Sequence, residues 1–213
     1  MTAPLDRAAL AAYLHERHGC HTVLLYGSVA RGEDGPESDV DAMGFRDAPG
    51  HENDTSSFGG RLLDVWIKPL SELNAAVEGG PEAREAFLHV AEGVLLADPQ
   101  GLLARLLEAV SREAQAPVPM DSKQREFLSG WCRKMLKRAA KGDPEGDLRL
   151  HWLLNDSLSI AFRYVELRYP GPKAALRWLA AENPGLHSLF VAALRPGAPL
   201  DAVRRLLDAM DEL

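Results

Sequence analysis

Residues 24–32 read Leu-Leu-Tyr-Gly-Ser-Val-Ala-Arg-Gly, and after a short loop residues 38–41 read Ser-Asp-Val-Asp. The first stretch continues an apolar run over residues 22–26, which predicts a buried strand that ends at Gly27. Because Gly27 has no Cβ, a phosphate group can approach the backbone there. Ser28 and the amides after it open a short helix, whose N-terminus favours an anion. The turn therefore predicts a phosphate-binding site.

Acidic residues interrupt two stretches that otherwise alternate as strands do. Asp39 and Asp41 lie in residues 38–45, so both carboxylates leave the same face of that strand, about 7 Å apart. Asp64 interrupts residues 61–68, and it can join the first two acids if the two strands pair, since paired strands lie about 4.8 Å apart. Carboxylates this close repel one another unless a cation lies between them. Hard oxygen ligands suit Mg²⁺, so we expect all three aspartates to bind it, as two-metal phosphoryl chemistry requires.

This combination resembles the DNA polymerase β-type nucleotidyltransferase superfamily. The resemblance consists of Gly27-Ser28, ten residues, Asp39-x-Asp41 and a later acid, Asp64, and it covers residues 22–67. The small size and the helical second half are similar to the bacterial antibiotic nucleotidyltransferases that adenylylate aminoglycosides or lincosamides. The resemblance implies a transferase that moves a nucleoside monophosphate, AMP, from ATP to a hydroxyl of a small molecule, with two Mg²⁺ ions and a role in antibiotic resistance.

Site residues follow from this resemblance. Gly27 and Ser28 are expected to hold the terminal phosphates, and Asp64 is expected to bind metal, to act as general base, or both. Arg31 either steers the triphosphate or pairs with Glu33 or Asp34.

The second half of the chain adds three candidates. Related antibiotic transferases place a lysine of the helical domain against the triphosphate, which would be Lys173 here; the alternative is a solvated first helical turn. Asp156 and Glu166 share a helical face, where they either hold a cationic acceptor or act as general base, or form ordinary ion pairs with Arg163.

The patterns predict an α+β fold with two domains. Residues 1–115 are expected to form a small mixed-sheet nucleotidyltransferase domain, and residues 116–213 an antiparallel helical bundle on the acceptor side. A connection rich in Gly, Asp, Asn and Ser spans about residues 47–60, a helix begins at Pro81, and residues 116–119 form a linker. Further helices are predicted over residues 4–18, 122–141, 145–168, 172–182, 185–194 and 199–212.

Composition limits the possible partners. The formal charge of −7 over 213 residues argues against a broad surface for long nucleic acid, which needs clustered Lys and Arg. Two distant cysteines exclude a disulfide scaffold, and no stretch suggests a signal peptide or a membrane span, so a cytoplasmic protein is expected. His15, His18 and His21 receive no role, and the oligomeric state stays open.

Two other functions use the same motif. One is a protein-modifying nucleotidyltransferase of the antitoxin kind, although such antitoxins are usually little more than the α/β domain. The other is a non-catalytic nucleotide-binding module, which the intact set of three acids disfavours.

Overall fold

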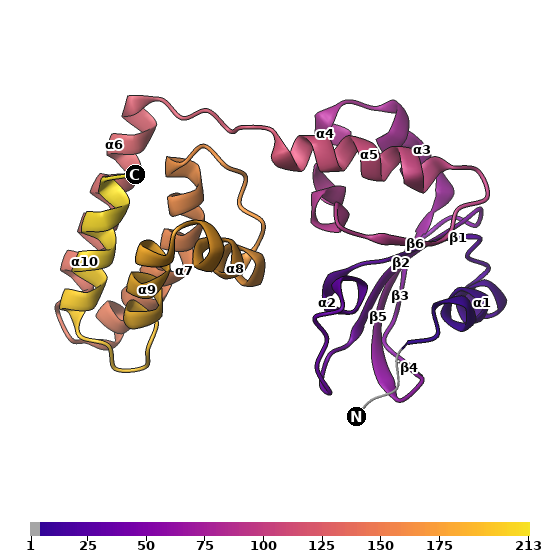
Figure 1. Cartoon of the computed structure of the whole chain (residues 1–213), viewed down its shortest axis with the longest axis horizontal. Helices are drawn as coiled ribbons and strands as arrows, with labels where there is room; N and C mark the ends of the chain where they lie inside the picture. The colour runs from indigo at the N-terminus through magenta and orange to yellow at the C-terminus, as the bar shows by residue number, and fades with distance from the viewer. Residues whose placement is uncertain (1–4) are drawn as a thin grey trace. The chain divides into compact units, whose positions relative to one another are not determined.

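The computed structural model describes residues 5–213, which divide between Ala114 and Gln115 into two compact units (Figure 1). The first unit contains a mixed six-stranded sheet with helices, and the second is entirely helical. The predicted α+β class is therefore confirmed. The boundary between the units falls at the end of helix α5, Leu102–Gln115.

The sheet of the first unit has the strand order β3-β5-β2-β1-β6, and β4 pairs with β5. Strand β2 runs parallel to β5, whereas β1 is antiparallel to β2 and β6, and β3 is antiparallel to β5. The strands are β1 Thr22–Leu25, β2 Val40–Arg46, β3 Glu52–Asp54, β4 Ser57–Phe58, β5 Arg61–Pro69 and β6 Val94–Ala97.

Alternation along the strands gives the sheet two faces with separate cores. Helices α1, Arg7–His18, and α2, Gly27–Arg31, pack on one face, where Val40, Ala42 and Val65 are fully buried. The opposite face carries Met43 and Phe45 and is covered by α3, Leu70–Glu78, by the 3₁₀ helix η1, Glu85–Val90, and by α5. A short α4, Pro81–Arg84, begins at the predicted proline.

Two sequence predictions about the first unit need correction. The connection predicted over residues 47–60 contains the short strands β3 and β4. Helix α1 begins at Arg7, whereas the prediction began at residue 4, which lies outside the described residues. Asp6 caps the helix by accepting a hydrogen bond from the Ala9 amide, which fixes this start.

The second unit is built from helices around its own apolar core, to which Leu153, Phe190 and Leu206 contribute fully buried side chains. Its helices are α6 Ser122–Ala139, α7 Pro144–Tyr164, α8 Pro172–Glu182, α9 Pro184–Ala193 and α10 Leu200–Asp211. Among the described residues, no helix combines the length and apolar character that a bilayer span requires.

Candidate active site

The glycine turn after β1 lies directly against Asp41. Gly27 has a φ of +73°, a conformation that side chains with a Cβ rarely adopt, and a Cβ added there would lie 2.0 Å from Oδ2 of Asp41. The amide of Tyr26 donates a hydrogen bond to the carbonyl of Asp41, at 2.9 Å. Only glycine fits this position, because the turn and the carboxylate occupy the same edge of the sheet.

Asp41 and Asp64 are direct neighbours on the parallel strands β2 and β5, where their Cα atoms pair in register. Their strand neighbours Ala42 and Val65 are fully buried on the α1 side, so both carboxylates leave the opposite face. Both aspartates are partly exposed, and Asp39, just before β2, is exposed. The pairing on which the sequence prediction depended is therefore present.

Tyr26, the residue before the glycine turn, lies close enough to the three aspartates for their charges to affect the pKa of its phenol. Burial raises the pKa of its phenol above the ordinary value of 10, and the charges of Asp41, Asp64 and Asp39 raise it further, in that order. Its ring meets His89 edge-on, with the centroids 5.3 Å apart. Tyr26 is thus a neutral phenol beside three acids, and it can donate a hydrogen bond to a carboxylate or a phosphate.

Asp64 is held by a residue that the sequence did not single out. The side-chain amide of Asn53, on β3, donates a hydrogen bond to Oδ1 of Asp64 at 2.9 Å. Asn53 fell in the predicted connection, so nothing in the sequence placed it beside the acids. For Tyr26 there was a signal, since it directly precedes the glycine at the strand end.

The carboxylate oxygens at this edge of the sheet are the type of ligand that Mg²⁺ prefers. Within residues 5–213, no group of three or more His, Cys, Asp or Glu side chains is gathered as a ready-made metal site. Mg²⁺ does not need one, because it usually binds one or two carboxylates and completes its coordination with waters and substrate phosphates. The in-register pair of Asp41 and Asp64 beside the Gly27 turn has this character.

Arg31 makes the ion pair with Glu33 that was one of its two predicted alternatives, and its predicted contact with a triphosphate stays a prediction. Its Nε donates to Glu33 at 2.8 Å, and its guanidinium also lies 3.8 Å from Glu92. Asp34, the other predicted partner, pairs with Arg61 at 2.8 Å. The guanidinium of Arg31 is therefore engaged by acids of the first unit.

The three candidates of the second half all lie in the second unit. Lys173 is exposed in the first turn of α8. Asp156 lies within α7, partly exposed, and accepts a hydrogen bond from Asn155 at 3.0 Å. Its charge, after burial, helps to raise the pKa of Tyr169.

Glu166 does not lie on the helical face that was predicted for it. Helix α7 ends at Tyr164, and Glu166 has a φ of +57°. Its carbonyl accepts the amide of Val118, and its carboxylate accepts the amide of Met120. The chain leaves the helix in a left-handed turn, so Glu166 and Asp156 do not share a face.

Comparison with known proteins gives little. No protein-family model and no curated protein sequence matches the chain. Among solved structures it is similar to a nucleotidyltransferase-like protein from Exiguobacterium sibiricum 255-15, at 11% identity and a TM-score of 0.43, over 96% of this chain and 73% of that one. A likeness this distant says nothing about function, which must be inferred from the geometry of the site.

Proposed function

We propose that the chain is a Mg²⁺-dependent nucleotidyltransferase that moves AMP from ATP to a hydroxyl of a small-molecule acceptor. One observation carries the proposal: Asp41 and Asp64 pair in register on adjacent parallel strands, at the edge where Gly27 packs against Asp41. Paired acids that can hold a cation suit phosphoryl transfer, because the substrate brings concentrated negative charge that a cation can offset.

The residues of the first unit divide the work. Gly27 and Ser28 would hold the terminal phosphates, and Asp39, Asp41 and Asp64 would hold Mg²⁺. Bound there, two Mg²⁺ ions would neutralise the phosphate charge and lower the pKa of the acceptor hydroxyl. Tyr26 remains protonated and can donate a hydrogen bond to the same group of oxygens.

The reaction is an in-line displacement at the α-phosphorus. The acceptor oxygen forms a bond to the α-phosphorus, and the bond from that phosphorus to the oxygen bridging to the β-phosphate breaks. Pyrophosphate leaves with the electron pair, and the acceptor proton passes to the carboxylate of Asp64. Positioning and charge stabilisation supply most of the rate in such transfers.

Roles in the second unit are proposed on the resemblance alone. Lys173 would contact the triphosphate, and Asp156 or Glu166 would bind the acceptor. Asp156 is the better supported of the two acids, because it is partly exposed on a helix, whereas Glu166 is tied into a turn. A helical unit with its own core favours a dedicated small-molecule acceptor, such as an aminoglycoside or lincosamide, over a protein acceptor.

A pyrophosphate-release screen tests the proposal. The purified chain is incubated with each nucleoside triphosphate and Mg²⁺, and with aminoglycosides, lincosamides, free nucleotides or candidate proteins as acceptors. Acceptor-dependent release that is lost in Asp41→Asn supports the assignment. Asp47→Asn is the matched control, because that carboxylate is 84% exposed and lies outside the site.

The outcome identifies the acceptor class. Release with a protein acceptor would favour the antitoxin-like alternative. Nucleotide binding without release on any acceptor would favour a non-catalytic module.

A further inference from the structure

We propose that Asn53 is a positioning residue for Asp64, and that a network of ionisable side chains around the buried His18 and Asp54, on the other face of the sheet, fixes Asn53 in place. This inference rests on the proposed function, since it gives Asn53 a purpose only if Asp64 binds metal or accepts a proton. The observation is the hydrogen bond from Nδ2 of Asn53 to Oδ1 of Asp64, at 2.9 Å.

The hydrogen bond engages one oxygen of Asp64 and leaves the other for chemistry. Within the described residues, Oδ2 of Asp64 accepts no hydrogen bond, whereas Oδ1 is occupied by the Asn53 amide. The amide also donates a longer hydrogen bond, at 3.4 Å, to the carbonyl of Val65, so it contacts β5 at two points. A carboxylate held by one oxygen keeps its rotamer, and this preserves its alignment with Asp41 on the neighbouring strand.

The donor is neutral, and this matters for an acid that must bind a cation. An arginine or lysine in the same place would pair with the carboxylate and compete with Mg²⁺. An amide orients the carboxylate without supplying a positive charge. Asn53 therefore combines positioning with an undiminished negative charge at Asp64.

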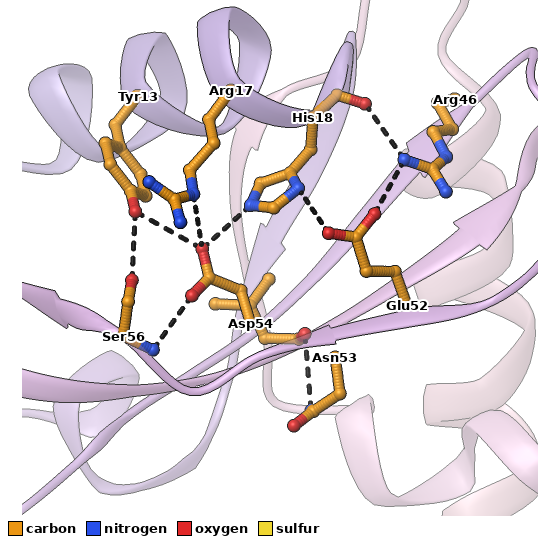
Figure 2. A network of polar contacts seen from close by, with 9 residues as sticks. Tyr13, Arg17, His18, Arg46, Glu52, Asn53, Asp54 and Ser56 are labelled. Carbon is orange, nitrogen blue, oxygen red and sulfur yellow. Dashed lines mark hydrogen bonds and ion pairs between the residues drawn. The ribbon is translucent and has the colours of Figure 1, made fainter.

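Strand β3 is short and polar, yet its residues on either side of Asn53 are anchored (Figure 2). Nδ1 of His18 lies 2.9 Å from Glu52, and Nε2 of His18 lies 2.7 Å from Asp54. Arg46 binds Glu52 at 2.9 Å and also approaches the carbonyl of His18. One buried imidazole at the end of α1 thus bridges both acids of the strand.

Because side chains alternate along β3, the contacts that anchor Glu52 and Asp54 on one face also fix the position of Asn53 on the other. Glu52 and Asp54 point toward α1, so Asn53 between them points toward Asp64. With both neighbours fixed, the backbone of Asn53 has little freedom to shift. The network and the amide together act as a brace for Asp64.

Mn²⁺ titration in the presence of α,β-methylene-ATP tests the proposal on the full chain. Asn53→Leu keeps the size of the side chain and removes the donor, and it should weaken Mn²⁺ affinity about 10-fold or more. Asn53→Gln keeps the amide and should recover most of the affinity. Thr55→Val is the matched control, since it is exposed just beyond β3 and should bind Mn²⁺ like the parent.

A double-mutant cycle separates positioning from a merely structural role. If Asn53 acts through Asp64, then Asn53→Leu should cause no further loss of Mn²⁺ affinity in the Asp64→Asn background. A full, additive loss in that background, or parental affinity in Asn53→Leu, would overturn the positioning role alone. A parent chain that binds neither Mn²⁺ nor the nucleotide would overturn the proposed function as well.

Discussion

Asp54 and Asp64 lie on the paired strands β3 and β5, and their side chains leave opposite faces of the sheet. Asp54 is buried among cationic partners, whereas Asp64 is not. Asp54, on β3, pairs in register with Val65, the residue next to Asp64. Its side chain is 4% exposed, and its Oδ2 lies 2.7 Å from Nε2 of His18 and 3.7 Å from Nε of Arg17. Asp64 is partly exposed and takes its hydrogen bond from the neutral amide of Asn53.

The two acids differ in whether their charge is paired inside the fold. Burial acts to raise the pKa of Asp54, but hydrogen bonds from Ser56 and His18 outweigh it and bring the pKa down to about 2. The charge of Asp54 is therefore used inside the protein, where it stabilises the fold. Asp64 is oriented by a neutral donor, and under the proposed function its charge would serve a cation or a proton from outside the chain.

The largest effect is expected at Asp64. Asp64→Asn should lower turnover by about 100- to 10,000-fold, because it removes the proton acceptor and a metal oxygen together. The free energy of unfolding should change by less than about 0.5 kcal/mol, since the side chain is partly exposed and an amide fits the same space. Pyrophosphate release and urea unfolding, measured on one preparation, give both values. A loss of stability as large as that at Asp54 would erase the distinction between the two acids.

Asp54→Asn should do the reverse. The substitution removes a buried charge from His18 and Arg17, and we expect it to cost about 2 kcal/mol in the free energy of unfolding. At a temperature where the variant is folded, Mg²⁺-dependent binding of nucleotide should weaken by about threefold, less than in Asn53→Leu, because one anchor of β3 is lost while the amide of Asn53 still donates to Asp64. Calorimetry after a check of folding by circular dichroism measures this. Parental affinity in the folded variant would show that the network does not steady Asn53, and a complete loss would show that Asp54 is not mainly a structural acid.

The main strands of the sheet were predictable because apolar alternation marks them. Residues 22–26, 38–45 and 61–68 correspond to β1, β2 and β5, whose inward positions are buried. The acids stood out because they interrupt this alternation. The register that brings Asp41 beside Asp64 depends on how the two strands pair in the folded chain. The sequence could predict only that the acids would meet if these strands paired.

Polar and long-range features escaped the sequence. Strand β3 consists of Glu52, Asn53 and Asp54, which carry no apolar pattern, and it is stabilised by His18 from 36 residues away. His18 therefore received no role. Glu166 was placed on a helix that in fact ends at Tyr164, because no Gly or Pro marks that end.

Low pH should lower the stability of the fold through protonation of Asp54. The pKa of Asp54 is about 2 in the folded chain and 3.8 ordinarily, so its stabilising contribution is present above about pH 4 and is lost as the pH falls toward 2. The parent should lose about 2 kcal/mol of unfolding free energy over this window through Asp54. Urea unfolding at several pH values should show a shallower slope in Asp54→Asn. An equal slope in both chains would remove Asp54 from the stabilising network.

The smallest effects are expected when the exposed cationic side chains Lys173 and Arg17 are removed. Lys173→Ala should weaken nucleotide affinity about 10-fold, because one ammonium contact to phosphate is lost, and it should leave stability unchanged. Arg17→Ala should cost about 0.5 kcal/mol or less of stability, since its side chain is 57% exposed, and it should leave nucleotide affinity unchanged. Titration and unfolding of both variants give the comparison. Parental affinity in Lys173→Ala would make Lys173 a solvated helix start.

The most direct test of the catalytic assignment is calorimetric titration of the parent and of Asp41→Asn with α,β-methylene-ATP, with and without Mg²⁺. This analogue cannot be cleaved at the bond that transfer would break, so binding is measured alone. The parent should bind the analogue only with Mg²⁺, and Asp41→Asn should lose that Mg²⁺-dependent binding while it unfolds at the parental urea concentration. Equal, Mg²⁺-independent binding by both chains, or none by the parent, would contradict the assignment of this edge of the sheet as a nucleotidyl-transfer site.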